Sequence, residues 1–213
     1  MNISIDDVVH LLHSASYGAL ATHSERAVGY PYATVLPFVL AEQHRPVFLL
    51  SSLAEHTKNL LSNPRASLVV SEESQPNVLA GARVSLMGDV TQWDADQRFV
   101  ARYLRYQPDG ERYLALGDFA FFRMTIKHVR AIAGFGAMGW IEPERWSQIA
   151  TLSLGAEAEY IKGMQALFSD DFHLLGIDRY GVDYVRTGVR ERRRFENTPL
   201  SDETLKHALR AFG

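Results

Sequence analysis

Residues 51–60, SSLAEHTKNL, gather side chains that suit a phosphate site at the start of a helix. The segment follows the apolar run RPVFLL and precedes LSNPRASLVV, which predicts a strand, then a short helix that stops before Pro64. A helix start attracts anions because its first amides are unpaired and its dipole is positive there. The candidate cofactor-binding side chains in this segment are Ser51, Ser52, His56, Thr57, Lys58 and Asn59.

The same segment also fits a helix that is only capped. With Ser52 as the N-cap, Glu55 falls at the spacing where the two side chains cap each other's backbone amides. A carboxylate at that position competes with an incoming phosphate for the positive helix end. The residues therefore leave two interpretations open, a capped helix and an anion site. In the anion site, Ser52 and His56 would act together, because His56 lies one helical turn after Ser52 on the same side.

Composition restricts the class of protein. The 213 residues are 46% apolar and 22% charged with a net charge of −3, which is typical of a globular chain and does not indicate nucleic acid as a partner. The lack of cysteine excludes disulfides, thiolate ligands, iron–sulfur clusters and cysteine nucleophiles. The acidic start MNISIDDVVH is unlike a signal peptide, and no apolar stretch reaches membrane-spanning length. We therefore expect a cytoplasmic protein without a membrane partner.

Residues 1–146 predict the barrel that positions these side chains. Runs rich in β-branched and aromatic residues are separated by Pro, Gly, Asn and charged clusters, as in strands at hairpin spacing. A helix is expected after Ser4, and two more are expected around a break at Pro108 and Gly110. About six strands with a few short helices favour a closed or nearly closed antiparallel barrel.

Residues 147–213 predict a small α+β unit. Apolar side chains recur at helical spacing over residues 155–168, the segments FHLLGID, GVDYVRT and VRERRRF read as strands, and Pro199 and Ser201 open a last helix. A unit of roughly 60 residues has only marginal stability by itself, so we expect it to pack on the barrel. A basic run interrupted by glutamates is interpreted as a solvated strand that splits its arginines between two faces: Arg190, Arg192, Arg193 and Arg194.

A resemblance to known proteins is carried by YPYATVLPFVLAEQHRPVFLLSSLAEHTKNLLSNPRASLVV and RVSLMGDV, which look like the flavin-binding split barrels related to pyridoxamine 5′-phosphate oxidase. The haem-utilisation branch, the HugZ-type proteins, is most similar in LAEHTKNL, NPRASL, RYLRYQPDGERYLALGDFAFFRM and GFGAMGW. Its small C-terminal domain resembles LLGIDRYGVDYVRTGVRERRRFENTPL. The resemblance implies an antiparallel split β-barrel followed by a small α+β domain, in a homodimer with two equivalent cofactor sites at the subunit interface.

The resemblance also implies where a cofactor would bind. In the oxidases, a strand arginine and an Arg-Lys pair hold the FMN phosphate; here Thr34 replaces the first, and Glu55 and His56 replace the pair. Arg83 takes the place of a glutamine, and its charge suits a phosphate, a flavin edge or a haem propionate. The oxidases' C-terminal substrate-binding arginine motif has no counterpart, so pyridoxamine phosphate oxidation is not expected.

Histidine decides whether haem is a reasonable cofactor, because a haem protein without cysteine most often uses an imidazole ligand. The resemblance places His56 beside the cofactor cleft, and HugZ-type enzymes take their ligand from the C-terminal part of the chain. His10 and His13, one turn apart, are interpreted as surface residues. The candidate haem ligands are therefore His56, His173 and His207.

Three functions remain compatible with the sequence. The first is a haem b-binding and haem-degrading protein, the second an FMN oxidoreductase, and the third a non-catalytic dimer that has lost its cofactor. In GFGAMGW, Trp140 can stack on a flat ring, although glycines there also fit tight strand packing. The missing phosphate cations count against FMN and the unmatched C-terminal ligand counts against haem, which leaves haem slightly favoured.

Overall fold

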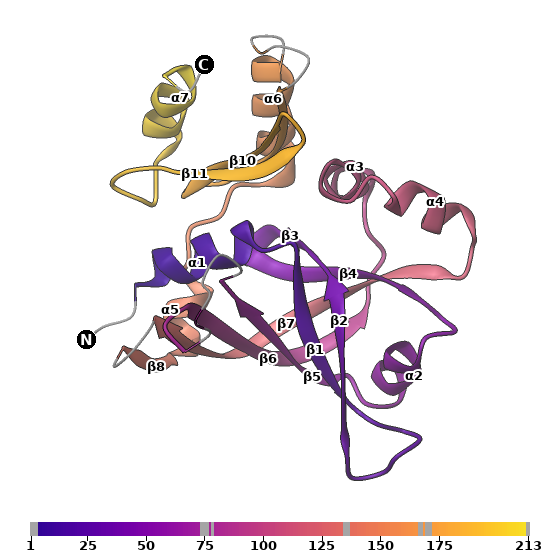
Figure 1. Cartoon of the computed structure of the whole chain (residues 1–213). Coiled ribbons are helices and arrows are strands. Elements are labelled where there is room, and N and C mark those ends of the chain that lie inside the picture. Colours follow the sequence, from indigo (N-terminus) through magenta and orange to yellow (C-terminus); the bar gives the residue numbers. More distant parts are fainter. Residues whose placement is uncertain are drawn as a thin grey trace.

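One antiparallel sheet of eight strands forms the barrel (Figure 1). The computed structural model describes residues 4–72, 77, 79–133, 137–165, 168 and 172–211. Neighbouring strands follow the order β2-β1-β5-β6-β7-β4-β3, and β8 pairs with β7 outside this path. Their bounds are β1 Tyr17–His23, β2 Pro31–Pro37, β3 Val39–Ala41, β4 Arg45–Ser51, β5 Arg65–Ser71, β6 Ala82–Gln92, β7 Phe119–Ala133 and β8 Met138–Ile141. The split-barrel architecture expected from the sequence is confirmed.

Short helices lie around this sheet. Asp96 starts one of them, because its side chain accepts a hydrogen bond from the Phe99 amide at 2.8 Å. The break expected at Pro108 and Gly110 separates two helices, α3 and α4. The bounds are α1 Ile5–Ser14, the 3₁₀ turn η1 Glu42–His44, α2 Glu55–Ser62, α3 Gln97–Tyr106, α4 Gly110–Ala115 and α5 Pro143–Ser147. No helix in the described ranges has both the length and the apolar character needed to cross a membrane.

Strand alternation produces the barrel core. Leu20 on β1, Leu68 on β5 and Leu86 on β6 are paired across neighbouring strands and are completely buried, each contributing about 1.5–3 kcal/mol by burial. Glycine is required at a bulge in β6, where a Cβ on Gly88 would lie 2.0 Å from the carbonyl oxygen of Thr125. The side chains that alternate with these leucines face outward and form the other surface of the sheet.

The C-terminal unit is a second, three-stranded sheet with two helices. Its order is β11-β10-β9, and Leu174, Val182 and Leu205 are among the residues of its own apolar core. The side chain of Ser201 caps the last helix by accepting from the Thr204 amide, as the sequence indicated. The bounds are α6 Leu154–Gln165, β9 Phe172–Ile177, β10 Gly181–Arg186, β11 Val189–Arg194 and α7 Asp202–Arg210. The α6 prediction ran to residue 168; residues 166 and 167 lie outside the described ranges.

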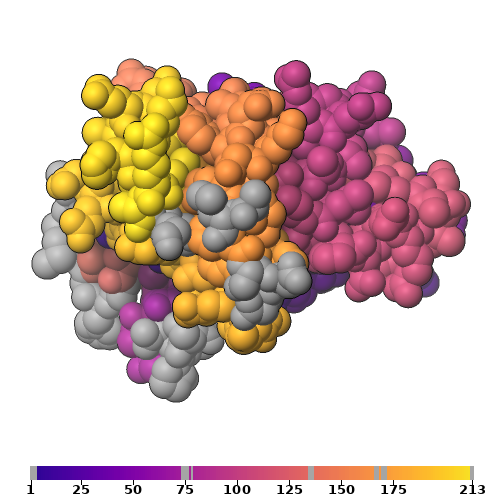
Figure 2. All heavy atoms as spheres, turned by 90° about the horizontal axis from the view of Figure 1, so that it is seen from above, coloured from indigo at the N-terminus to yellow at the C-terminus, as the bar shows by residue number. Residues whose placement is uncertain are grey.

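The C-terminal unit packs on the barrel through α1 and α3. Figure 1 shows its sheet above α1, and Figure 2, from above, shows α6 beside α3. Arg190 donates to the carbonyl of His13 at 2.6 Å, and Arg194 pairs with Asp7 at 2.5 Å. The chain between the two units has Trp146 in the barrel core and Leu152 in the C-terminal core.

A buried ion pair joins α3 to α6 at this junction. Arg102 forms a very short contact with Glu157, and the two side chains are 5% and 3% exposed. Arg102 also donates to the carbonyl of Leu40 at 2.8 Å, while Glu157 accepts from the Ile177 amide at 2.9 Å. Burial acts to lower the pKa of Arg102, but Glu157 outweighs it and holds the pKa above its usual value. Both groups are therefore charged inside the protein.

The start of α2 differs from the expected capping box. The N-cap is Ala54, without a side-chain cap, and Glu55 is already the first helical residue. The Ser51 hydroxyl instead donates to Asp118 at 2.6 Å and accepts from the Leu53 amide at 3.1 Å. The Ser52 N-cap prediction is wrong because a long-range contact between Ser51 and Asp118 sets the chain direction four residues before the helix begins.

Candidate functional site

The residues expected around α2 divide into exposed and buried sets. Asn59 is completely buried: its Oδ1 accepts from the Glu25 amide at 2.8 Å, and its Nδ2 donates to Thr22 at 3.0 Å. Thr57 is also buried, and its hydroxyl has no partner within the described residues. Asn59 thus ties the β1–β2 hairpin to α2, so its carboxamide already has partners within the chain.

The side chains near the exposed surface of α2 are Ser52, Lys58 and the half-buried His56. Burial lowers the pKa of His56 below 6.5, so its imidazole is neutral at neutral pH and is able to bind a metal ion. Thr34 lies on β2 opposite Leu20, and α2 contacts both β1 and β2. Thr34, Ser52, His56 and Lys58 therefore belong to the α2 side of the barrel.

Arg83 and Trp140 lie elsewhere on the sheet. Arg83 pairs with Ser71 and Ile132, three strands away from Thr34, and its side chain has the outward parity, opposite to Leu86. Trp140 is 58% exposed, and the Arg130 guanidinium lies over its ring, 5.6 Å from the ring centre, in a cation–π contact. One chain alone does not bring these two residues to α2.

The two histidines expected from the C-terminal part are exposed. His173 lies on β9, in the same sheet as β10 and β11, and His207 lies on α7. Figure 1 shows β10, β11 and α7 above α1, while α2 lies at the lower side of the barrel. The residues Gly134–Gly136 of the GFGAMGW motif lie outside the described ranges. The sequence-predicted set is therefore distributed over three regions of the chain.

A groove on the outer face of the sheet contains polar side chains that the sequence reasoning missed. Its volume is about 440 Å³, and it crosses β1, β5, β6 and β7 at one end of the strands. His23 and His128 are both exposed there. The Lys127 ammonium pairs with Asp89 at 2.5 Å. The other groove side chains used below are Arg65 and Met87.

Strand register explains why these side chains meet. Met87 pairs with Ser67 on one side and with His128 on the other, and Arg65 pairs with Asp89. Side chains of one parity on neighbouring strands share a face, so residues more than 100 positions apart come to one groove. The available signal was the outward parity of His23 and His128, but it becomes informative only when the strand order is known.

Comparison with known proteins adds the family. The sequence model of the protein family described as CREG, beta-barrel, matches residues 9–148, about two thirds of the chain. The chain belongs to the CREG beta-barrel family. The expected kinship with the split barrels related to pyridoxamine 5′-phosphate oxidase is confirmed with it. Every groove side chain of this CREG barrel lies inside the matched residues, whereas β9, β10 and β11 lie beyond them.

Individual relatives include haem proteins. The chloroplastic non-canonical heme oxygenase HOZ of Arabidopsis thaliana is 34% identical over 132 residues, or 61% of this chain and only 40% of that relative. A haem-binding protein from Mycobacterium smegmatis is 25% identical, with a TM-score of 0.63 over 99% of this chain and 96% of the other. A protein of unknown function from Agrobacterium tumefaciens shares the fold at 21% identity, with a TM-score of 0.76 over 97% and 94%.

Proposed function

We propose that this CREG-family chain binds haem in the groove on the outer face of its sheet. The observation that carries the proposal is the donor set of that groove, which combines two imidazoles, two cations and an apolar strand surface. The haem-related names of the Arabidopsis and Mycobacterium relatives support the same cofactor.

The groove residues match the parts of a haem. An axial ligand is available from His128 or His23, both accessible imidazoles. Arg65 and Lys127 are cations suited to the two propionates. Met87 and the alanines of β1 and β5 offer apolar contact to the ring. When bound, haem supplies redox and dioxygen chemistry, while these side chains bind, orient and shield it.

Haem titration of the purified protein tests this proposal. We expect a Soret shift that saturates in the wild type, with at least about tenfold weaker binding in His128→Ala or His23→Ala, because an axial bond contributes strongly to affinity. His173→Ala and His207→Ala are matched controls on the C-terminal unit and should bind as the wild type does. Loss of binding only in His56→Ala would move the site to α2, and FMN co-purification without a Soret shift would refute haem. Loss of the Soret band with added reductant would indicate haem degradation.

We further propose that the chain forms a homodimer through the outer sheet face. A ladder of paired residues crosses this face from one edge to the other, and its members are exposed or half-buried: Val35, Ala19, Val69, Ser85, Arg130 and Trp140. Val35 and Trp140 are 63% and 58% exposed, which is unusual for large apolar side chains in a ladder. A second copy would cover them, border the groove, and bring its Arg83 and Trp140 toward the α2 side of its partner.

Val35→Arg should convert the dimer to a monomer, because it places a charge at the apolar end of the ladder, where the second copy would bury it. Sedimentation velocity measures the result. Val189→Arg is the matched control, since Val189 on β11 is similarly exposed, at 59%, but belongs to the C-terminal unit. A monomeric wild type, or equal dissociation by both variants, would contradict the proposed interface.

A further inference from the structure

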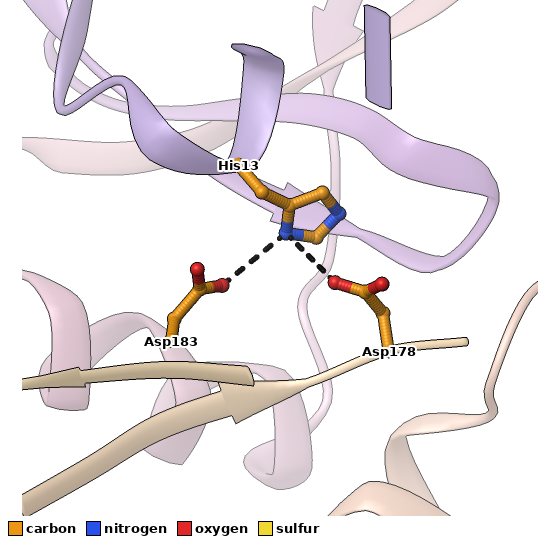
Figure 3. A group of neighbouring side chains, drawn as sticks. All are labelled: His13, Asp178 and Asp183. Atoms are coloured by element: carbon orange, nitrogen blue, oxygen red, sulfur yellow. Dashed lines mark ion pairs between the residues drawn. The ribbon is translucent and has the colours of Figure 1, made fainter. Parts of the chain in front are cut away.

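A buried cluster of charges lies where the barrel meets the C-terminal unit (Figure 3). His13, in the last turn of α1, is 4% exposed, so its interpretation as a surface residue is wrong. Its Nδ1 faces Asp178 at 3.3 Å and Asp183 at 3.4 Å. The two aspartates come from β10 and from the turn before it, so this contact joins the two units.

Arg192 on β11 belongs to the same cluster. Its side chain is only 2% exposed, with Nη1 at 2.9 Å from Asp178 and at 3.0 Å from Asp183. The interpretation of this run as a solvated strand is therefore wrong for Arg192. The expected division of the arginines between two faces of the strand holds, because alternate residues share one face: Arg190, Arg192 and Arg194 all contact α1. The face that was expected to be solvated is covered by the barrel.

Hydrogen bonds fix the direction of the protons around His13. His44 Nε2 lies 3.3 Å from the carbonyl oxygen of Ala150, which only accepts, so Nε2 carries a proton. Burial, followed by the charge of His13, lowers the pKa of His44 to about 3, so this ring is neutral and its Nδ1 is an acceptor. His13 Nε2, at 2.9 Å from that atom, must therefore be the donor. A neutral His13 would then turn a bare Nδ1 lone pair toward two carboxylates.

A positive charge must lie between Nδ1 and the aspartates, and a proton fits better than a metal ion. Most carboxylate oxygens already accept other donors: Asp178 Oδ1 takes the Tyr180 amide at 2.7 Å, and Asp183 Oδ2 takes the Tyr106 hydroxyl at 2.7 Å. Among the groups in direct contact with one another, the carboxylates of Asp178 and Asp183 and the guanidinium of Arg192 leave one negative charge, which one proton on His13 cancels and a divalent ion would overcompensate. Uncompensated buried charge is costly, so neutrality decides for the proton.

We propose that His13 is held as a doubly protonated imidazolium that fastens the C-terminal unit to the barrel, so that docking of the two units depends on this proton. The backbone supports the arrangement, since Gln43 and His44 adopt positive φ angles of 60° and 52° to present the His44 ring. Charged and titratable groups from every neighbouring element face His13, the two aspartates or the small cavity beside them. On the barrel side they are His10 on α1, Glu42 and His44 on η1, and Arg102 and Tyr106 on α3. On the C-terminal side they are Glu157 on α6, Asp178 in the turn before β10, Asp183 on β10, and Arg190 and Arg192 on β11.

Nitrogen-15 NMR of the wild-type side chains gives the first test, without any substitution. We expect both ring nitrogens of His13 to carry protons at neutral pH, and His44 to carry one proton only. When the pH is raised until Nδ1 loses its proton, exchange of the β10 backbone amides should increase beyond the intrinsic pH effect. A bare His13 Nδ1 at neutral pH, in metal-free protein, would overturn the proposal.

Variants test the charge balance. In His13→Gln, exchange of the β10 amides should rise on the order of 100-fold, since one carboxylate loses its counter-charge. His13→Gln/Asp183→Asn restores neutrality and should recover most of that protection. His207→Gln, an exposed histidine on α7 whose side chain is outside this cluster, is the matched control and should exchange as the wild type does. Wild-type exchange in His13→Gln, no recovery in the double variant, or a stoichiometric metal ion lost in His13→Gln would each overturn the proposal.

Discussion

Arg102→Met should lower the free energy of unfolding by about 3–5 kcal/mol, toward the lower end of this range. The substitution leaves Glu157, which is 3% exposed, as a buried carboxylate without its principal counter-charge. Arg105 still lies 3.4 Å from the other Glu157 oxygen and offsets part of the loss. Urea unfolding followed by circular dichroism measures the change as a shift of the midpoint at constant slope.

The double variant Arg102→Met/Glu157→Met separates the buried charge from the lost packing. Because removing both charges leaves no unpaired carboxylate, it should recover at least half of the stability that Arg102→Met loses. Arg186 and Glu191 form an exposed pair, 57% and 34% accessible, so Arg186→Met should change stability by less than about 1 kcal/mol. Additive losses in the double variant would show that the ion pair is not the reason for the destabilisation.

The barrel was predictable because its signals are local. Strands such as Arg45–Ser51 and Ala82–Gln92 combine β-branched residues with breaks at Pro, Gly and Asn, and the break between α3 and α4 lies at Pro108 and Gly110. The Ser201 cap depends only on the first turn of the helix that follows it, where the Thr204 amide lies 3.3 Å from the Ser201 hydroxyl. Features that depend on residues a few positions apart are visible in the sequence.

Features that depend on distant partners were not predictable in the same way. Ser52 and Glu55 have the spacing of a capping box, but Asp118, 67 positions from Ser51, sets the approach to α2. His13 is buried by side chains that lie more than 160 positions later in the chain. Period-two alternation assigns residues to two faces of a strand, but it does not say which face another unit will cover.

The candidate site shows the same limit. The family resemblance indicated the α2 segment, whereas the groove with His23 and His128 depends on the strand order β1-β5-β6-β7. Arg83 and Trp140 lie on the outward face, so they meet the α2 side only if a second chain supplies them. A site shared between strands or between chains requires knowledge of the register before its members can be grouped.

Acid should destabilise the protein well before its carboxylates titrate. His44 is neutral in the folded state because burial, and then the charge of His13, lowers its pKa from 6.5 to about 3. The unfolded chain takes up a proton on this residue below pH 6.5, so the contribution of His44 to stability is complete above that pH and is lost as the pH falls toward 3. The loss is about 1.4 kcal/mol per pH unit within this window, or about 2 kcal/mol at pH 5.

Asp178 extends the loss to lower pH. Burial acts to raise the pKa of this carboxyl, but Arg192 and then His13 lower it from 3.8 to about 2. A depressed carboxyl pKa stabilises the fold above pH 3.8, and this contribution disappears as the pH falls to about 2. The midpoint of urea unfolding, measured from pH 8 to pH 2, should therefore fall below pH 6.5 and fall more steeply below pH 3.8, where both groups contribute.

His44→Asn tests the loss of stability that begins below pH 6.5. Asparagine tolerates the positive φ of this position and does not titrate, so the slope between pH 6.5 and pH 4 should become shallower by nearly one proton. His56→Gln is the control. The pKa of the half-buried His56 is also lowered by burial, so this variant should reduce the slope of stability against pH by less than His44→Asn does. An unchanged slope in His44→Asn would mean that this ring accepts its proton in the folded state, and the proton direction inferred for the His13–His44 pair would then be wrong as well.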